Sequence, residues 1–125
     1  MALHHAAAGE VVDLSLMPLS AETEHSTAIV KTAQFEAIRL LIPRGTDMPR
    51  HQVPGSITLH CLEGCVQLGL GETVTQLAAH QWVYLEGGAP HSIKGLDDSV
   101  LLLTILFPPA DVSIGEPAGA SISQD

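Results

Sequence analysis

The sequence predicts an all-β domain, a sandwich or barrel built from short strands. Apolar residues alternate with polar residues over stretches of about four to eight positions, and clusters of Gly, Pro or Asp separate these stretches. No stretch shows the apolar period of about 3.6 residues that is typical of an amphipathic helix. The chain has 125 residues, which is the length of one domain with a substantial buried core.

Seven segments fit this pattern as strands. We expect strands within 35–42 (FEAIRLLI), 56–62 (SITLHCL), 66–70 (VQLGL), 73–77 (TVTQL), 82–85 (WVYL), 91–94 (HSIK) and 100–107 (VLLLTILF). The last segment is an unbroken run of branched and apolar residues, which favours a strand buried on both faces. In segment 82–85, Trp82 and Tyr84 share one face because successive side chains of a strand point to opposite sides.

Composition excludes several classes of partner. The net charge is -9 and only five residues are Lys or Arg, so we expect no nucleic-acid binding. The longest apolar run is too short for a helix that crosses a membrane, and we expect no membrane partner. The N-terminus lacks the basic region and apolar core of a signal peptide, so the expected location is cytoplasmic. Cys61 and Cys65 are too few for a disulfide framework and are expected to be reduced thiols.

Both ends of the chain lack a hydrophobic period and are small, polar, or rich in Pro and Gly. We therefore expect residues 1–10 to be disordered and residues 109–125 to form a flexible tail. The barrel is expected to span residues 11–108.

The segment RHQVPGSITLHCLEG contains two histidines, His51 and His60, and the alternation of side chains along the predicted strand decides which face His60 occupies. If Leu62 and Val66 both face the core, residues 63–65 form a short hairpin loop whose central glycine takes the left-handed conformation. His60 then points inward together with Leu62, and Cys61 points outward. This arrangement is the basis for treating His60 as a site residue.

Three histidines in structured context, His51, His60 and His91, form a candidate metal centre. Imidazole is the commonest protein ligand for transition metals, and three neutral imidazoles leave open positions for water or substrate. Ni, Zn, Fe and Mn are the candidate ions. The alternative for His60 is a neutral core histidine that is satisfied by one hydrogen bond.

Two motifs of the sequence resemble those of the small single-domain cupins, the RmlC-like jelly-roll family. The run GTDMPRHQVPGSITLHCLEG resembles the first motif, with Gly45, His51 and Gly64 at the expected spacing, and LEGGAPHSI resembles the second, with Gly88 and His91. The resemblance covers residues 35 to 108. It implies a cupin double-stranded β-helix, or jelly-roll barrel.

The departures from these motifs concern the metal site most directly. Two of the four usual ligands are missing, since Val53 replaces the second histidine and Ile57 or Thr58 takes the place of the glutamate. In the second motif, the positions of the opening glycine, the proline and the terminal asparagine are held by His80, Glu86 and Gly95. A rearranged site of His51, His60 and His91 is therefore the form in which metal binding is expected.

Three functions stay open at this point. The resemblance implies a metal-dependent enzyme, with Glu86 as the nearest carboxylate. The apolar residues expected to line the barrel, with the histidines as polar anchors, fit instead a metal-free module that binds a small molecule. The third is a structural homodimer, because dimers in the family commonly form through sheet edges and exchanged N-terminal strands. The residues expected to line the pocket are Val53, Thr58, Leu62, Leu68, Trp82 and Tyr84.

Overall fold

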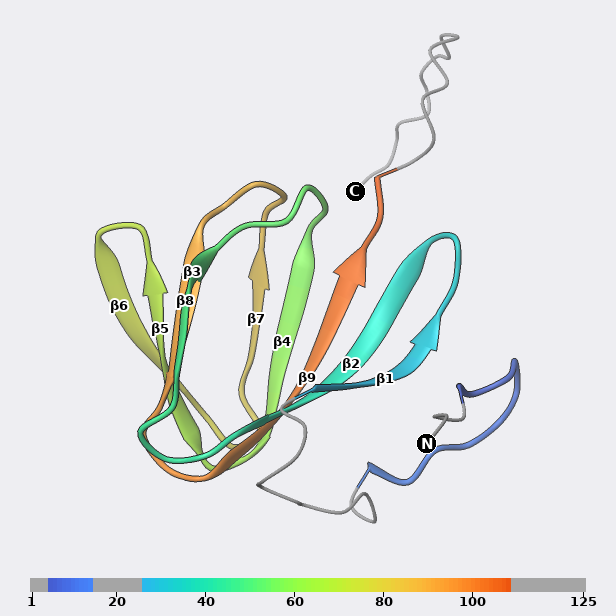
Figure 1. Ribbon diagram of the computed structural model, residues 1–125, viewed down its shortest axis with the longest axis horizontal. Coiled ribbons are helices and arrows are strands. Elements are labelled where there is room, and N and C mark those ends of the chain that lie inside the picture. Colours follow the sequence, from blue (N-terminus) through green and yellow to red (C-terminus); the bar gives the residue numbers. More distant parts are fainter. Residues whose placement is uncertain (1–4, 15–25, 109–125) are drawn as a thin grey trace, which may run out of the picture.

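The computed structural model describes residues 5–14 and 26–108, and within these residues nine strands form two antiparallel sheets. The sheets face each other as a flattened barrel (Figure 1). The strands are β1 (Ser26–Lys31), β2 (Phe35–Ile42), β3 (Asp47–His51), β4 (Ile57–Glu63), β5 (Cys65–Leu70), β6 (Thr73–Ala78), β7 (Trp82–Leu85), β8 (His91–Gly95) and β9 (Ser99–Leu106).

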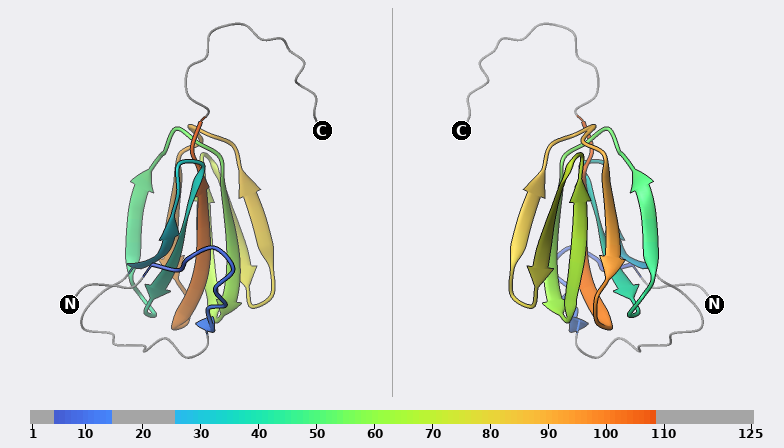
Figure 2. Two further views of the ribbon diagram at one scale, coloured as in Figure 1. Left: turned by 90° about the vertical axis from the view of Figure 1, so that its right-hand side faces the viewer. Right: turned by 90° about the vertical axis from the view of Figure 1, so that its left-hand side faces the viewer.

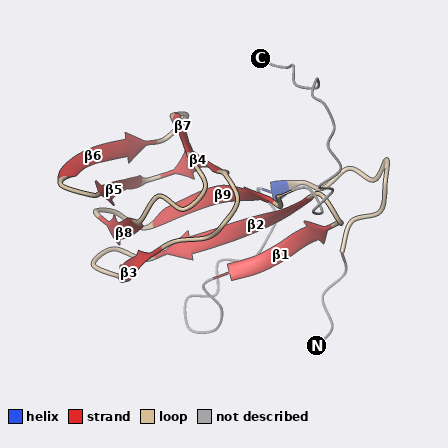
Figure 3. Cartoon of the chain, turned by 90° about the horizontal axis from the view of Figure 1, so that it is seen from above, coloured by secondary structure: helices blue, strands red, loops and turns tan. Residues whose placement is uncertain are grey.

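The strand order shows a jelly roll. Sheet A has the order β1-β2-β9-β4-β7, and sheet B has the order β3-β8-β5-β6. Consecutive strands therefore often lie in different sheets, as the two side views show (Figure 2). Seen from above, β6 and β7, each an edge strand of its sheet, lie at the same end of the barrel (Figure 3).

The hydrophobic core lies between the two sheets. Sheet A contributes Leu59, Cys61 and Leu101, and sheet B contributes Val66 and Leu68, all with no exposed surface. In β4, β5 and β8, alternate residues point into this layer, as expected for antiparallel sheets with one buried face. On β2, Leu40 and Ile42 belong to this core, and Ile38 packs against it.

The seven predicted strands are confirmed, and two further strands, β1 and β3, were not predicted. In β3, Pro49 has no backbone N–H to donate, which argues against a strand in a sequence pattern. The structure accommodates this residue because β3 is the edge strand of sheet B and its pairing with β8 shifts register between Met48 and His51.

The predicted hairpin at residues 63–65 is wrong, although the left-handed glycine is confirmed. Gly64 has a φ of 86°, but β4 belongs to sheet A and β5 to sheet B, so the chain changes sheets at this glycine. A Cβ on Gly64 would lie 2.3 Å from the carbonyl oxygen of Asp98. The position therefore requires glycine for its backbone conformation and for the close approach of another segment.

The N-terminal segment 5–14 runs beside sheet A. The Ala6 N–H donates to the Ile29 carbonyl of β1, and the Glu10 N–H donates to the Ala7 carbonyl. Residues 5–14 thus follow a defined path, and the first strand among the described residues begins at Ser26. Residues 1–4, 15–25 and the predicted tail 109–125 lie outside the described residues. In the part that is described, there is no helix of the length and apolarity needed to cross a membrane.

Candidate functional site

Two of the predicted site histidines, His51 and His91, come together in sheet B. His51 ends β3 and His91 begins β8, and the two residues are direct partners in the antiparallel ladder. His91 is 4% exposed and lies on the same face of β8 as the core residue Ile93. Its Nδ1 lies 3.2 Å from the carbonyl oxygen of Ala89, an acceptor to which a protonated Nδ1 would donate.

The other two ligand positions of the cupin motifs are occupied by hydrocarbon. Ile57 is 2% exposed and belongs to the core, and Val53 is partly buried against that core. Thr58 lies on the opposite face of β4 from Ile57. Alkyl side chains offer no lone pair to a metal ion, so this half of the motif cannot coordinate one.

The structure places His60 away from this site. On β4, Ile57, Leu59 and Cys61 face the core, and His60 therefore points out of the barrel. The inward orientation predicted for His60, and the outward one for Cys61, are wrong. The reason is that the parity count assumed a core-facing Leu62, whereas Leu62 lies on the outer face together with His60.

The remaining pocket predictions divide between the two faces of the sandwich. Val53 and Leu68 lie on the core side, as expected. Thr58 and Leu62 lie on the outer face of sheet A, and they are joined there by Trp82, which is 60% exposed, and Tyr84, which is 51% exposed. The predicted shared face of Trp82 and Tyr84 is confirmed, but it is an outer face.

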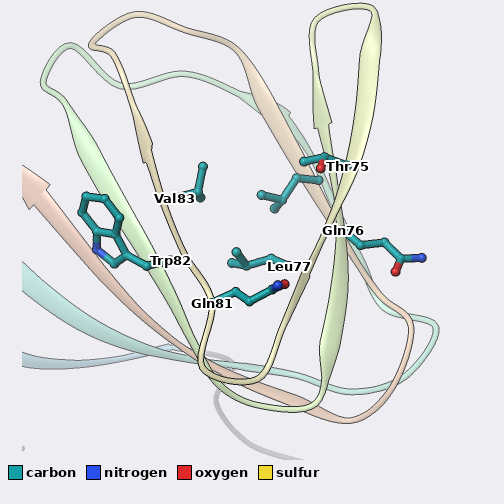
Figure 4. Close-up of a pocket in the computed structure, with 7 residues that line it drawn as sticks. Thr75, Gln76, Leu77, Gln81, Trp82 and Val83 are labelled. Atoms are coloured by element: carbon teal, nitrogen blue, oxygen red, sulfur yellow. The ribbon is translucent and has the colours of Figure 1, made fainter.

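A pocket of about 370 Å³ opens between the edge strands β6 and β7 (Figure 4). Its residues are Leu68, Thr75, Gln76, Leu77, Gln81, Trp82 and Val83. Leu77 and Val83 project into the space, whereas the Trp82 ring lies on the other side of β7. The Oε1 atom of Gln81 accepts a hydrogen bond of 2.8 Å from the Ala78 N–H, which fixes this side chain at the rim.

Sequence reasoning missed this pocket. Leu77 and Val83 are visible in the sequence as alternating apolar residues, but nothing local shows that their strands are edges that face each other. That relation depends on the jelly-roll order, in which β6 ends sheet B and β7 ends sheet A. No side chain that lines the pocket carries a formal charge.

No group of three or more His, Cys, Asp or Glu side chains that would suit a metal ion occurs among the side chains that the structure describes, which do not include those of residues 49–51. Both cysteines are free thiols, as predicted. Burial raises the pKa of the Cys61 thiol, and its hydrogen bond to the Glu63 carbonyl opposes this rise.

Comparison with solved structures shows the same architecture in several proteins. A conserved protein of unknown function from Streptococcus pyogenes is 19% identical, with a TM-score of 0.74 over 86% of this chain and 95% of that one. A cupin superfamily protein from Desulfitobacterium hafniense DCB-2 is 13% identical, with a TM-score of 0.72 over 83% of this chain and 95% of that one.

A more distant match is the oxalate decarboxylase of Bacillus subtilis, a protein with Mn(II) centres. It is 15% identical, with a TM-score of 0.56, over 58% of this chain and 21% of the enzyme. No family model matches the chain, and no curated protein matches it in sequence. Together with the strand order, the structural matches show that the chain has the cupin fold, a double-stranded β-helix.

Proposed function

We propose that this cupin-fold protein is a binding module that holds a neutral small molecule between β6 and β7, without a resident metal ion. The observation that carries the proposal is the uncharged pocket of about 370 Å³ whose floor is part of the core. Ligand pockets are typically concave, mostly apolar, and of about 300–1,000 Å³, with a few polar groups that fix the ligand.

The cupin ligand positions argue against a metal enzyme. Only His51 and His91 remain as donors at these positions, and Val53 and Ile57 supply alkyl groups. Protein metal sites of this kind usually rely on three or four protein ligands, so two histidines hold an ion weakly. The oxalate decarboxylase has Mn(II) centres on the same fold, but the residues here do not fit such a centre.

The lining predicts the chemistry of the ligand. Leu68, Leu77 and Val83 offer an apolar surface, and Thr75 and Gln81 offer a hydroxyl and an amide at the edge of the pocket. A charged ligand would lose its hydration and find no countercharge there, which is costly. The pocket therefore suits a neutral, largely apolar molecule with one or two hydrogen-bonding groups.

The test uses N-phenyl-1-naphthylamine, a neutral apolar dye whose fluorescence rises in an apolar environment. The wild-type protein is expected to bind the dye saturably. Val83→Phe is expected to weaken binding on the order of tenfold, because the larger side chain fills the pocket. Val74→Phe is the matched control, since Val74 is 63% exposed and does not line the pocket, and it should bind as the wild type does.

Gln81→Glu keeps the acceptor for the Ala78 N–H but adds a charge, so it tests the same site without overpacking. It is expected to weaken dye binding while the thermal unfolding midpoint stays close to that of the wild type. Equal dye binding by the wild type, Val83→Phe and Gln81→Glu would show that the pocket is not the binding site. An absence of dye binding by the folded wild type would also reject the proposal.

A further inference from the structure

β7 is an edge strand of sheet A, and its outer side faces no other strand among the described residues. The Cys61 N–H donates to the Gln81 carbonyl, so the backbone groups of Cys61 point toward β7. Backbone groups alternate in direction along an antiparallel ladder, and Val83 therefore exchanges hydrogen bonds with β4. The N–H and C=O groups of Trp82 and Tyr84 point the other way, to the open edge of the sheet.

The other three sheet edges each carry a feature that hinders the addition of a strand. Beside β1, the Ala6 N–H of the N-terminal segment donates to the Ile29 carbonyl. β3 contains Pro49 and a register shift. On β6, the Oε1 atom of Gln81 accepts a hydrogen bond from the Ala78 N–H. β7 has no proline, charged residue or register shift in its four residues, so its edge lacks the usual protection.

The side chains on both faces of β7 leave room for a neighbouring strand. On the outer face, Trp82 is 60% exposed and Tyr84 is 51% exposed. On the inner face, Val83 borders the pocket of about 370 Å³, with Leu77 of β6 on its far side (Figure 4). Alternate side chains of an added strand would lie beside the two aromatic rings, and the others would enter the pocket.

We propose that the open edge of β7 binds an extended, basic peptide of a partner protein by strand addition. In this mode, main-chain hydrogen bonds provide affinity, and pockets for alternate side chains provide specificity. Trp82 and Tyr84 supply the main-chain groups, and the pocket beside Val83 accepts apolar side chains of the peptide. The pocket is therefore the specificity pocket of a larger peptide site.

Charge favours a basic peptide over the other occupants of this edge. Glu72 precedes β6 and Glu86 follows β7, so both exposed residues lie at the end of these strands away from the connecting turn. None of the five basic residues lies on β4, β6 or β7, and Arg39 of the same sheet lies three strands away. Residues 109–125 contain three acidic residues and no basic one, and a second copy carries the same charge of -9. Both would be repelled, whereas a basic peptide is attracted.

The probe is a peptide of seven residues in which valine alternates with threonine and a lysine stands at each end. Its ends are acetylated and amidated. When the two threonines pair with Trp82 and Tyr84, the valines face the pocket. Since only two residues of β7 offer main-chain groups, we expect weak binding, with a dissociation constant on the order of 10–100 μM.

Trp82 reports binding because it is the only tryptophan in the chain. Its emission should shift to the blue as the peptide saturates the edge. Hydrogen exchange gives a readout for single residues. The Trp82 and Tyr84 amides should exchange more slowly in the complex, since each gains an acceptor. The Val83 amide, which is bonded to β4 in the free protein, should change little.

Backbone methylation of the peptide separates strand addition from binding through side chains alone. Methylation of the two threonine nitrogens removes the N–H groups that would donate to β7, and it should weaken binding on the order of tenfold or more. Methylation of two valine nitrogens is the matched control, because these N–H groups point away from β7. That peptide should bind as the parent peptide does.

Two proline substitutions apply the same test to the protein. Tyr84→Pro removes an outward N–H, and edge strands accept proline at such positions, so the fold should be kept while binding weakens on the order of tenfold. Val74→Pro is the matched control on β6. Its N–H also points outward, because the Ala79 N–H donates to the Gly64 carbonyl. It should bind the peptide as the wild type does, and both variants should unfold near the wild-type temperature.

Four outcomes would overturn the proposal. The first is no binding of the parent peptide at millimolar concentration, and the second is equal binding of the threonine-methylated peptide. The third is fast exchange of the Trp82 and Tyr84 amides in the complex. The fourth is slow exchange of these amides in concentrated protein without peptide, which would assign the edge to a second copy.

The inference rests on the proposed function in one respect, since the pocket must admit apolar groups. Bound peptide should therefore displace N-phenyl-1-naphthylamine, and a peptide that leaves the dye bound would contradict its placement in the pocket. Binding of the dye without binding of the peptide would reject only this inference. Binding of the peptide without binding of the dye would reject only the small-molecule site.

Discussion

At the scale of single residues, the backbone conformation of four motif positions explains which substitutions the fold accepts. Gly45, Gly64 and Gly88 have φ values of 84°, 86° and 81°, and His80 has a φ of 74°. In the cupin motifs the His80 position is a glycine. Histidine is among the residues that enter the left-handed region, but its Cβ makes that conformation costly.

Replacement of His80 by glycine is expected to stabilise the protein by about 1 kcal/mol, because it removes this strain. Gly88→Ala should have the opposite effect of similar size, since no other atom lies within 4 Å of the added Cβ and only the backbone strain counts. Urea unfolding of the two variants and the wild type measures both changes. A less stable His80→Gly would show that the imidazole makes a compensating contact.

Cys61 is expected to make the free energy of unfolding depend on pH in the alkaline range. Because burial raises its pKa above the ordinary 9.0, the folded state holds this proton more tightly than the unfolded state does. The resulting stability is fully present below pH 9.0 and is lost as pH rises through the folded pKa. The free energy of unfolding should therefore fall more steeply above pH 9.0 in the wild type than in Cys61→Ala.

Iodoacetamide labelling provides the control for this prediction. Cys65 is partly exposed and should react well before Cys61, which is fully buried. Cys65→Ser should leave the alkaline slope of stability intact. Equal slopes in the wild type and Cys61→Ala would contradict the assignment of the proton to Cys61.

At the scale of the elements, hydrogen bonds of the Ser99 side chain stabilise the point between β4 and β5 where the chain passes from sheet A to sheet B. This side chain is fully buried, accepts a hydrogen bond of 3.0 Å from the Cys65 N–H, and lies 2.8 Å from the Asp97 carbonyl as a donor. One hydroxyl thus joins the start of β5 to the start of β9. A buried N–H group without an acceptor destabilises the folded state, so the hydrogen bond from Cys65 to Ser99 stabilises the crossover between the sheets.

Ser99→Ala is expected to lower the free energy of unfolding by about 1–3 kcal/mol, because it leaves the Cys65 N–H without its acceptor. Hydrogen exchange at Cys65 should become faster than in the wild type. Ser92→Ala is the matched control on β8, where the serine is partly buried. A loss of stability as large in Ser92→Ala would show that the Ser99 hydrogen bonds are not the cause.

The sequence predicts where most strands begin and end, because these boundaries depend on residues that are neighbours in the chain. The sequence located β2 and β7 to the residue, because each is a run rich in branched and aromatic residues that ends at a turn, residues 43–45 after β2 and residues 86–88 after β7. β3 was missed because Pro49 interrupts it, and β1 because its residues show no clear alternation. The sheet to which each strand belongs depends on pairing partners far apart in the chain, which no local pattern contains.

At the scale of the whole molecule, the cupin motifs predicted the fold better than they predicted the site. Gly45, Gly64 and His91 occupy the positions that the resemblance implies, and the barrel forms around them. The role expected for His60 depended on a core-facing Leu62, and Leu62 lies on the outer face instead. The pocket between β6 and β7 arises from the closure of the jelly roll and has no sequence motif.

We propose that the cupin ligand positions of this protein do not form a metal site. The decisive measurement is the metal content of untagged protein, by plasma mass spectrometry, after incubation with Mn, Fe, Ni or Zn ions and desalting. The matched positive control is the double variant Val53→His and Ile57→Glu, which restores the missing ligands and should retain about one ion per chain when folded. We predict that the wild type retains far less than one ion per chain, whereas near-stoichiometric metal in the wild type would contradict the account.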